Sequence, residues 1–391
     1  MKNPFEFGRA LTSTELVDRE EELAEVTAAL LGSSKLFLIG PRRYGKTSIL
    51  RAAELEATHS GAVVLRYDAE SFPTLASLAE RLLADATRKL TPTIEKAGAA
   101  LRDFFVRLRP QASIDPQTGE WSVSLTIEDD SKQIPLLVDV IDGIERLAAR
   151  AKVPVAIIFD EFQKIVEVGG ADAEAQLRAA VQHHKQLAYV FAGSKTRLLA
   201  DMTSDPNRPF YKLGNVRFLG PIPRVEFASF LERGFIAGGI AVQPGATDAI
   251  LDAAEDVPYN IQLLAHACWE ACRESLGKVK SGRHPAALTP GLVERTRDVI
   301  AQRSDPIYTQ LWTRLSSFQQ RALLALLREG GVGLATNAVA RRYRLSIPAL
   351  AKSLKLLERK SIIREEQTLG NTRLRLEDPF FGAWIALVIP A

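Results

Sequence analysis

Cysteine and methionine are the rarest residues of this chain, with 2 of each among 391 residues. Cys268 and Cys272 stand one helical turn apart on an expected helix, so they do not form a disulfide framework. Further Cys or His residues at metal-ligand spacing are also missing. We therefore expect each cysteine to be a buried apolar thiol.

Long apolar runs are missing as well. Residues 1–5 contain no apolar signal core, and no stretch of about twenty apolar residues occurs anywhere in the sequence. This pattern predicts a cytosolic protein that does not enter a membrane. The formal net charge is +3, which permits an acidic partner without demanding one.

One stretch has the residues and the spacing of a phosphate-binding P-loop. Its members are, in order, Gly40, Pro41, Arg42, Arg43, Tyr44, Gly45, Lys46 and Thr47. They follow an apolar run over 36–39 that predicts a buried parallel strand, and Ser48 continues into a segment with helical periodicity. The glycines let the backbone wrap around a phosphate, and the helix adds the positive end of its dipole. We expect this whole stretch, with Ser48, to line a nucleotide site.

Two side chains of the P-loop have specific expected roles. Lys46 can reach the β- and γ-phosphates of ATP as a mobile point charge. Thr47 can place its hydroxyl in one octahedral position of Mg²⁺. The alternative is a strand-turn-helix that holds no ligand, and the match at every fixed position of the motif argues against it.

A second apolar run, over 155–159, ends in the carboxylates Asp160 and Glu161. A carboxylate at the C-terminal end of a buried parallel strand lies beside the P-loop, where open α/β sheets bind ligands. We expect Asp160 to hold Mg²⁺ through a water molecule. We expect Glu161 to orient or deprotonate the water that attacks the γ-phosphate.

A third apolar run, over 187–193, leads into Ser194. Its hydroxyl could contact the γ-phosphate or the attacking water, or it could be an ordinary loop cap, and both interpretations stay open. Together with an expected strand over 62–68, a run over 216–222 brings the expected strands to five. Several arginines are candidates to approach the γ-phosphate, in cis or from another subunit, and one sequence does not choose among them: Arg197, Arg208, Arg217 and Arg224.

The pattern changes twice along the chain. We expect a P-loop domain over 1–222, with a hairpin inserted near 110–130, then a helical lid over 223–305 and a winged helix over 306–391. Within the lid, Pro258 either starts a helix or approaches the nucleotide. His183 and His184 follow a helical segment without partner ligands nearby in sequence, so we expect a surface or capping role for both.

The last section shows three helical patterns followed by two β-like runs, which is the order of a winged helix-turn-helix. Its basic residues suit phosphate contacts by the third helix and the wing: Arg341, Arg342, Arg344, Lys352, Lys355, Arg359, Lys360, Arg364, Arg373 and Arg375. The third helix offers no set of side chains that reads bases, so sequence-specific readout is not supported. Double-stranded DNA and a protein surface both remain open as partners.

With these motifs in place, the chain resembles the archaeal-type ATPases, a branch of the STAND class of AAA-like P-loop NTPases. The resemblance rests on the segments 17–20, 40–47, 159–163, 192–194, 257–259 and 376–381. It implies an α/β fold whose parallel sheet has the strand order 5-1-4-3-2, followed by a helical lid and a winged helix. It also implies that Arg19 lines the adenine site and that Pro258 corresponds to the proline of the family's Gly-x-Pro motif.

Together these observations predict an ATP-binding, Mg²⁺-dependent ATPase with slow turnover. The nucleotide state would set the position of the lid and of the winged helix, which acts on DNA or on a protein partner. The alternative is a regulator that does not hydrolyse ATP, in which ATP or ADP is a structural ligand and the winged helix binds DNA. Self-association is compatible with both hypotheses.

Overall fold

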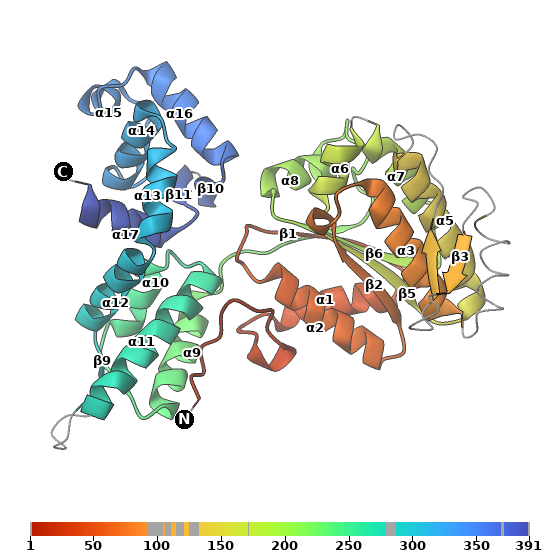
Figure 1. Cartoon of the computed structure of the whole chain (residues 1–391), viewed down its shortest axis with the longest axis horizontal. Coiled ribbons are helices and arrows are strands. Elements are labelled where there is room, and N and C mark those ends of the chain that lie inside the picture. The colour runs from red at the N-terminus through yellow and green to blue at the C-terminus, as the bar shows by residue number, and fades with distance from the viewer. Residues whose placement is uncertain are drawn as a thin grey trace. The chain divides into compact units, whose positions relative to one another are not determined.

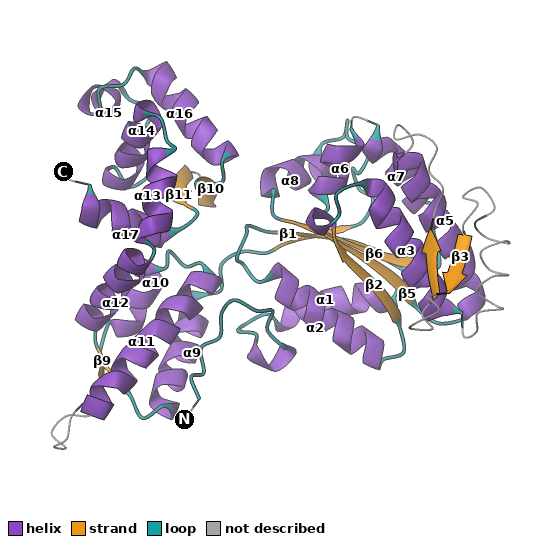
Figure 2. Ribbon diagram, viewed as in Figure 1, coloured by secondary structure: helices purple, strands orange, loops and turns teal. Residues whose placement is uncertain are grey.

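The structure is a computed structural model that describes residues 2–91, 105, 111–114, 121–124, 133–170, 172–278, 287–368 and 371–389. The chain divides into two units. The first, which we call the sheet unit, is formed by Gly8–Pro223, and the second, the helical unit, by Met1–Phe7 together with Arg224–Ala391. Figure 2 shows the central sheet of the first unit and the predominance of helices in the second.

Parallel strands form the sheet of the first unit: β1 (Lys35–Ile39), β2 (Val63–Asp68), β5 (Val155–Asp160), β6 (Leu187–Gly193) and β7 (Asn215–Phe218). They lie in the order β2-β5-β6-β1-β7. If the five strands are numbered in chain order, the sheet has the order 2-3-4-1-5. Read from the opposite edge, this is 5-1-4-3-2, so the order implied by the resemblance is confirmed. Strands β5 and β6 are buried at every position, which explains their continuous apolar sequences.

Helices cover both faces of this sheet (Figure 1). On one face, α1 (Glu20–Leu31) packs against α2 (Lys46–His59). The other face carries α3 (Leu75–Leu90), α5 (Gln133–Ala151) and α7 (Ala173–Val181). Shorter elements complete the unit: η1 (Ser13–Glu15), η2 (Ala69–Ser71), α6 (Gln163–Gly169) and α8 (Thr196–Ser204). The sheet unit is therefore a three-layer α/β structure.

An aromatic cluster fixes the strands of the sheet unit relative to one another. Phe37 of β1 stacks on Phe191 of β6 with ring centroids 4.9 Å apart. Phe210 packs edge-on against Phe37, with centroids 5.8 Å apart, and all three rings are buried. Burial of each such ring stabilises the fold by roughly 1.5–3 kcal/mol, so this cluster holds β1 and β6 side by side.

A two-stranded hairpin lies between α3 and α5 in the chain. Strand β3 (Gln111–Ile114) pairs in antiparallel fashion with β4 (Trp121–Ser124). The remainder of the expected insertion near 110–130 lies outside the described residues.

His184 is buried, so the surface or capping role expected from the sequence is wrong for this residue. It is 6% exposed, its Nδ1 atom lies 2.6 Å from the hydroxyl of Tyr189, and its Nε2 atom lies 2.9 Å from Oδ1 of Asp142. Tyr189 belongs to β6 and Asp142 to α5. Tertiary packing supplies both partners, and a local pattern of residues does not reveal them.

The helical unit begins with packed helices: α9 (Arg224–Ala237), α10 (Ala246–Ala253), α11 (Pro258–Lys278), α12 (Pro290–Arg303) and α13 (Asp305–Thr313). The short strands β8 (Ala241–Val242) and β9 (Ala287–Leu288) pair in parallel. Cys268 and Cys272 lie on α11 and are buried thiols, which confirms their predicted role. Burial raises the pKa of Cys268 to about 12 and that of Cys272 to about 11.

Three helices and a hairpin follow in the expected order. They are α14 (Ser317–Arg328), α15 (Asn337–Arg342), α16 (Ile347–Arg359), β10 (Ile363–Thr368) and β11 (Asn371–Leu376), and the two strands are antiparallel. Ser316 and Ser346 cap α14 and α16, because their hydroxyls accept hydrogen bonds from the backbone N–H groups of Gln319 and Ala349.

The last helix, α17 (Pro379–Val388), is strongly apolar. It buries Phe380, Phe381 and Trp384 within the helical unit. The indole N–H of Trp384 donates a hydrogen bond to Oδ1 of Asp305 at 2.8 Å. Across the described ranges, no helix combines the length and the apolar character needed to cross a membrane.

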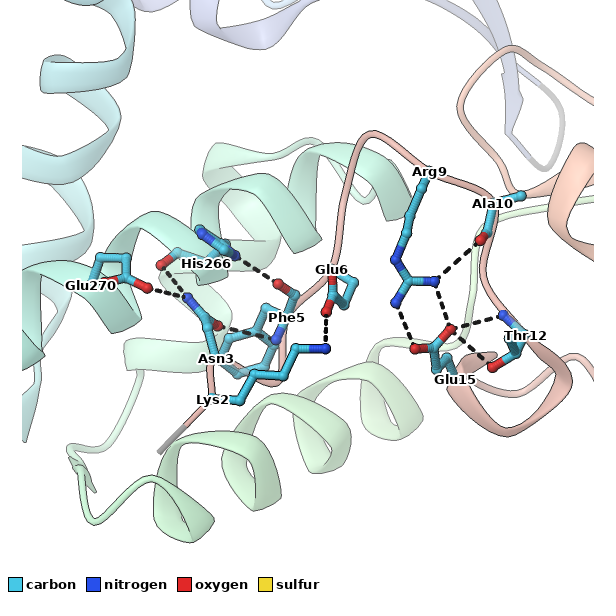
Figure 3. Close-up of polar contacts among 10 residues, drawn as sticks. All are labelled: Lys2, Asn3, Phe5, Glu6, Arg9, Ala10, Thr12, Glu15, His266 and Glu270. Carbon is cyan, nitrogen blue, oxygen red and sulfur yellow. Dashed lines mark hydrogen bonds and ion pairs between the residues drawn. The ribbon is translucent and has the colours of Figure 1, made fainter.

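The first residues of the chain pack into the helical unit (Figure 3). The amide of Asn3 donates hydrogen bonds to the backbone oxygen of His266 at 3.2 Å and to Oε1 of Glu270 at 3.0 Å. Phe5 is fully buried, and its ring centroid lies 4.7 Å from that of Phe235. The sequence gives no sign of this placement, since the domain boundaries expected from it keep residues 1–7 with the P-loop.

Substitution of Phe5 tests this packing. Phe5→Ala removes a fully buried ring and is expected to lower the free energy of unfolding of the helical unit by about 3–5 kcal/mol. Denaturant unfolding followed by the fluorescence of Trp269, Trp312 and Trp384 measures this decrease. The control is Lys2→Ala, because the Lys2 side chain is 85% exposed. Equal stability of the two variants would contradict the packing.

Candidate nucleotide-binding site

The site lies where neighbouring parallel strands end. Strand β6 pairs with β1 on one side and with β5 on the other, so the carboxyl ends of all three strands open on the same edge of the sheet. The P-loop follows β1 and runs into α2, Asp160 ends β5, and Ser194 follows β6. The fold therefore brings together the P-loop, the acidic pair and Ser194 from three separate segments of the chain.

The backbone of the P-loop is shaped by close packing and by left-handed conformations. A Cβ atom at Gly40 would lie 2.8 Å from Cβ of Leu219 and 2.9 Å from its backbone oxygen, so only glycine fits there. Arg43 and Gly45 have φ values of +67° and +93°. Gly45 caps the N-terminus of α2, whose unpaired N–H groups favour an anion.

Lys46 is folded back onto the loop. It is 5% exposed, and its Nζ atom donates hydrogen bonds to the backbone oxygens of Gly40 and Pro41, both at 2.9 Å. These acceptors are neutral carbonyls. Because hydrogen bonds to charged acceptors are stronger, a phosphate would compete well for this ammonium group.

Thr47 and Asp160 join the P-loop to the end of β5. The Thr47 hydroxyl donates a hydrogen bond to Oδ2 of Asp160 at 3.1 Å. Burial and the negative charge of Glu161 raise the pKa of Asp160, and Lys46 and Thr47 partly offset this rise. The two side chains offer oxygen ligands, which Mg²⁺ prefers, and this donor set fits a magnesium ion.

The described residues contain no group of three or more His, Cys, Asp or Glu side chains placed to hold a metal ion. Mg²⁺ in nucleotide sites is usually held by one or two carboxylates together with the substrate phosphates. The Thr47–Asp160 pair therefore matches a site that is completed by a nucleotide.

Glu161 is held by hydrogen bonds from two neighbours. Its Oε2 atom accepts from the side-chain amide of Gln163 at 2.5 Å, and from the hydroxyl and backbone N–H of Ser194 at 2.8 and 3.2 Å. Burial alone would raise the pKa of Glu161, but these hydrogen bonds and the charge of Lys46 outweigh it and leave the pKa below its usual value. Ser194 thus contacts the acidic pair directly in this structure.

The other predicted residues of the P-loop differ in exposure and contacts. Arg42 and Arg43 are exposed, and Arg42 forms an ion pair with Glu70 at 3.1 Å. Tyr44 is buried. The Ser48 hydroxyl accepts a hydrogen bond from the backbone N–H of Leu11 at 3.1 Å, so it ties the segment before α1 to the start of α2.

Arg19 links the start of α1 to the segment after β7. It is 5% exposed, and its guanidinium donates to the backbone oxygen of Gly220 at 2.6 Å and to Oε1 of Glu22 at 3.1 Å. Burial lowers the pKa of Arg19, and the charge of Glu22 partly compensates. Because Leu219 lies against Gly40, Arg19 holds the same segment that shapes the P-loop.

The candidate arginines for the γ-phosphate have different surroundings. The side chain of Arg197 lies outside the described part of the structure. The others form ion pairs within their own unit: Arg208 with Glu174, Arg217 with Glu21, and Arg224 with Asp256. Pro258 is the first residue of α11, which agrees with its interpretation as a helix start, and its approach to the nucleotide stays a prediction.

Sequence reasoning missed one polar residue of the site. Gln163, which begins α6, is 2% exposed and bonds Glu161, yet in the sequence it stands out only as part of a family motif. The signal that could have identified Gln163 in the sequence is its position two residues after Glu161, which itself follows the apolar strand. Helical or strand periodicity does not distinguish such a residue from a solvent-exposed one.

This fold and this site define a P-loop NTPase. The chain matches the family described as Novel STAND NTPase 1 over residues 7–373. Because the match covers most of the chain, the protein belongs to this family, and the resemblance to the STAND class is confirmed. A search of curated proteins found no match.

Two of the solved structures that match this chain illustrate the shared fold. The Walker-type ATPase PABY2304 of Pyrococcus abyssi is 19% identical, with a TM-score of 0.60 over 98% of this chain and 99% of that chain. The ORC2 protein of Aeropyrum pernix, solved as ADPNP-ADP complexes, is 13% identical, with a TM-score of 0.54 over 99% of this chain and 97% of that chain. Identities this low establish the arrangement of the chain alone.

The close packing of Gly40 gives a test of the loop geometry. Gly40→Ala forces Leu219 away from the P-loop and is expected to lower the free energy of unfolding by about 1–3 kcal/mol. Chemical denaturation of the full chain measures this change. Gly220→Ala is the matched control, because a Cβ atom there meets no heavy atom within 4 Å. A similar decrease in both variants would show that Leu219 does not restrict this loop.

Proposed function

We propose that this protein binds ATP with Mg²⁺ in the P-loop site and hydrolyses it slowly, as a nucleotide-driven switch. The observation that carries the proposal is the hydrogen bond between Thr47 and Asp160, which places a P-loop hydroxyl next to a carboxylate at the end of β5. Lys46 and Glu161 lie on the same two segments. P-loop ATPases require these side chains to meet at one point.

The proposed reaction is in-line attack of water on the γ-phosphorus, which yields ADP and phosphate. Thr47 and Asp160 would hold Mg²⁺, which would neutralise charge on the phosphates when bound. Lys46 exchanges its two carbonyl acceptors for phosphate oxygens, and the N–H groups at the start of α2 hold the phosphates in place. Glu161 orients the water and accepts its proton.

Two further contacts are proposed on the basis of the family resemblance. Arg19 lies next to the segment after β7, and we place the adenine ring beside it. Pro258 is proposed as the counterpart of the proline in the family's Gly-x-Pro motif. The base specificity of binding, measured with ATP and GTP, tests this placement.

We also propose that α14 to α16 and the β10–β11 hairpin form a winged helix that binds the backbone of double-stranded DNA. Support comes from exposed basic side chains on and between α15 and α16: Arg341, Arg344, Lys352, Lys355 and Arg359. Phosphate contacts dominate non-specific DNA affinity and require such side chains. This surface, which we call the α15–α16 basic face, is proposed to contact phosphates without reading bases.

The arginines of the hairpin are engaged within the helical unit, so the expected contribution of the wing is not supported. Arg364 is 7% exposed and donates a hydrogen bond to the backbone oxygen of Leu376. Arg375 forms ion pairs with Glu366 at 2.5 Å and with Glu255 at 3.7 Å. DNA contacts are therefore proposed for the α15–α16 basic face alone.

The rival hypothesis is a regulator that holds ATP or ADP without hydrolysis. It is supported by the internal hydrogen bonds that restrain Lys46 and Glu161 in this structure. Phosphate release above background, together with its disappearance in Lys46→Ala, decides for the ATPase. Tight nucleotide binding without turnover decides for the regulator.

Substitution of Glu161 tests the hydrolytic step. Glu161→Gln is expected to lower kcat by about 10²–10⁴-fold, since it removes the proposed general base, while ATP binding stays within a few-fold of that of the unaltered protein. Phosphate release and calorimetric titration with ATP measure the two quantities. Glu167→Gln is the control, because Glu167 is half-exposed and pairs with Lys195. Equal turnover in both variants would remove Glu161 from its role.

Duplex DNA tests the partner. Lys352→Ala/Lys355→Ala is expected to weaken binding and to reduce the slope of log K against log salt by about 0.9 for each phosphate that the protein no longer neutralises. Lys185→Ala, on the sheet unit, serves as the exposed control. Binding that is absent or insensitive to salt would support docking to a protein partner instead.

Self-association and a cytosolic location stay predictions. The solution mass with and without ATP tests the first, and cell fractionation tests the second.

A further inference from the structure

One buried polar side chain of the site has no role in the proposed reaction. Gln163 is 2% exposed, and its Nε2 atom donates a hydrogen bond to Oε2 of Glu161 at 2.5 Å. Its other polar atom, Oε1, is buried and has no hydrogen-bond partner among the described residues. Native proteins rarely leave such an atom unpaired, because an unpaired buried acceptor costs stability.

The end of β6 is shaped around this amide. A Cβ atom at Gly193 would lie 2.1 Å from Oε1 of Gln163 and 2.6 Å from Cδ1 of Leu199. The glycine thus leaves the space that the amide occupies. Ser194, the next residue, contacts the same carboxylate oxygen of Glu161 as the amide does.

Glu161 itself has an unusual backbone conformation. Its φ value is +49°, in the left-handed region that residues with a side chain rarely adopt. Strain of this kind persists only where surrounding contacts enforce it. Here the backbone N–H of Glu161 donates a hydrogen bond to Oδ1 of Asp160 at 3.0 Å, and that of Phe162 donates to the backbone oxygen of Ala192 at 2.8 Å. The side chain of Glu161 is held separately, because the hydrogen bonds from Gln163 and Ser194 converge on a single carboxylate oxygen, Oε2.

We propose that Gln163 is a positioning residue for Glu161. Its amide fixes one carboxylate oxygen against Ser194, so that the other oxygen faces the attacking water. This inference rests on the proposed function, because it takes Glu161 as the group that handles the water. The unpaired Oε1 of Gln163 and the left-handed backbone of Glu161 both cost stability. Residues that are retained at such a cost are typical of functional sites, where their geometry matters.

Gln163→Met tests this role in the full chain, because methionine keeps the buried volume and removes the amide. We expect kcat to fall about tenfold, a smaller decrease than removal of a general base causes, while KM for MgATP and the affinity for ATP change less than about twofold. Gln182→Met, at the exposed end of α7, is the matched control and leaves both constants unchanged.

A second measurement does not depend on turnover. A double-mutant cycle with Glu161→Met and Gln163→Met, followed by denaturant unfolding without nucleotide, reports the coupling between the two side chains. We expect the unfolding equilibrium constant to show a coupling of about tenfold or more, as for a hydrogen bond to a charged group.

The two measurements separate the inference from the function on which it rests. Absence of hydrolysis by the unaltered protein overturns the proposed function and the inference with it. Hydrolysis with unchanged kcat in Gln163→Met overturns the inference alone. A fall in kcat that is matched by weaker ATP binding shows a merely structural glutamine and also overturns the inference. A coupling below about twofold in the cycle shows that Gln163 does not hold Glu161, which overturns it as well.

Discussion

The candidate site depends on the pairing of β6 with both β1 and β5. Parallel strands place their carboxyl ends on one edge, so this pairing alone brings the P-loop next to the acidic pair. The hydrogen bond from Thr47 to Asp160, at 3.1 Å, joins residues that are far apart in the chain. The aromatic cluster of Phe37, Phe191 and Phe210 provides the burial that keeps β1 and β6 together.

Several features of the site cost stability. Lys46 and Asp160 are charged and almost fully buried, and Glu161 has a left-handed backbone. Burial of charge and strain of the backbone both cost free energy, which the apolar layers on either side of the sheet offset. Buried charges and backbone strain that cost free energy are typical of functional sites.

The helical unit combines segments from both ends of the chain. Residues 2–7 pack against α9 and α11, with Phe5 in the core of this unit. At the other end, Glu255 lies near Arg364 and Arg375 of the hairpin, so the hairpin is linked to the turn before α11 by charge. Unlike Arg364 and Arg375, the basic residues of the α15–α16 basic face are exposed.

The P-loop, the acidic pair and the apolar strands can all be predicted from the sequence, because each of them is a local pattern with a fixed spacing. The family resemblance added the order of the strands, which the sheet confirms. The folded chain was needed to find the partners of Gln163 and His184, the internal pairing of Arg375 and the placement of Phe5. Each of these depends on contacts between segments that packing brings together, and the period of a single helix or strand carries no information about them.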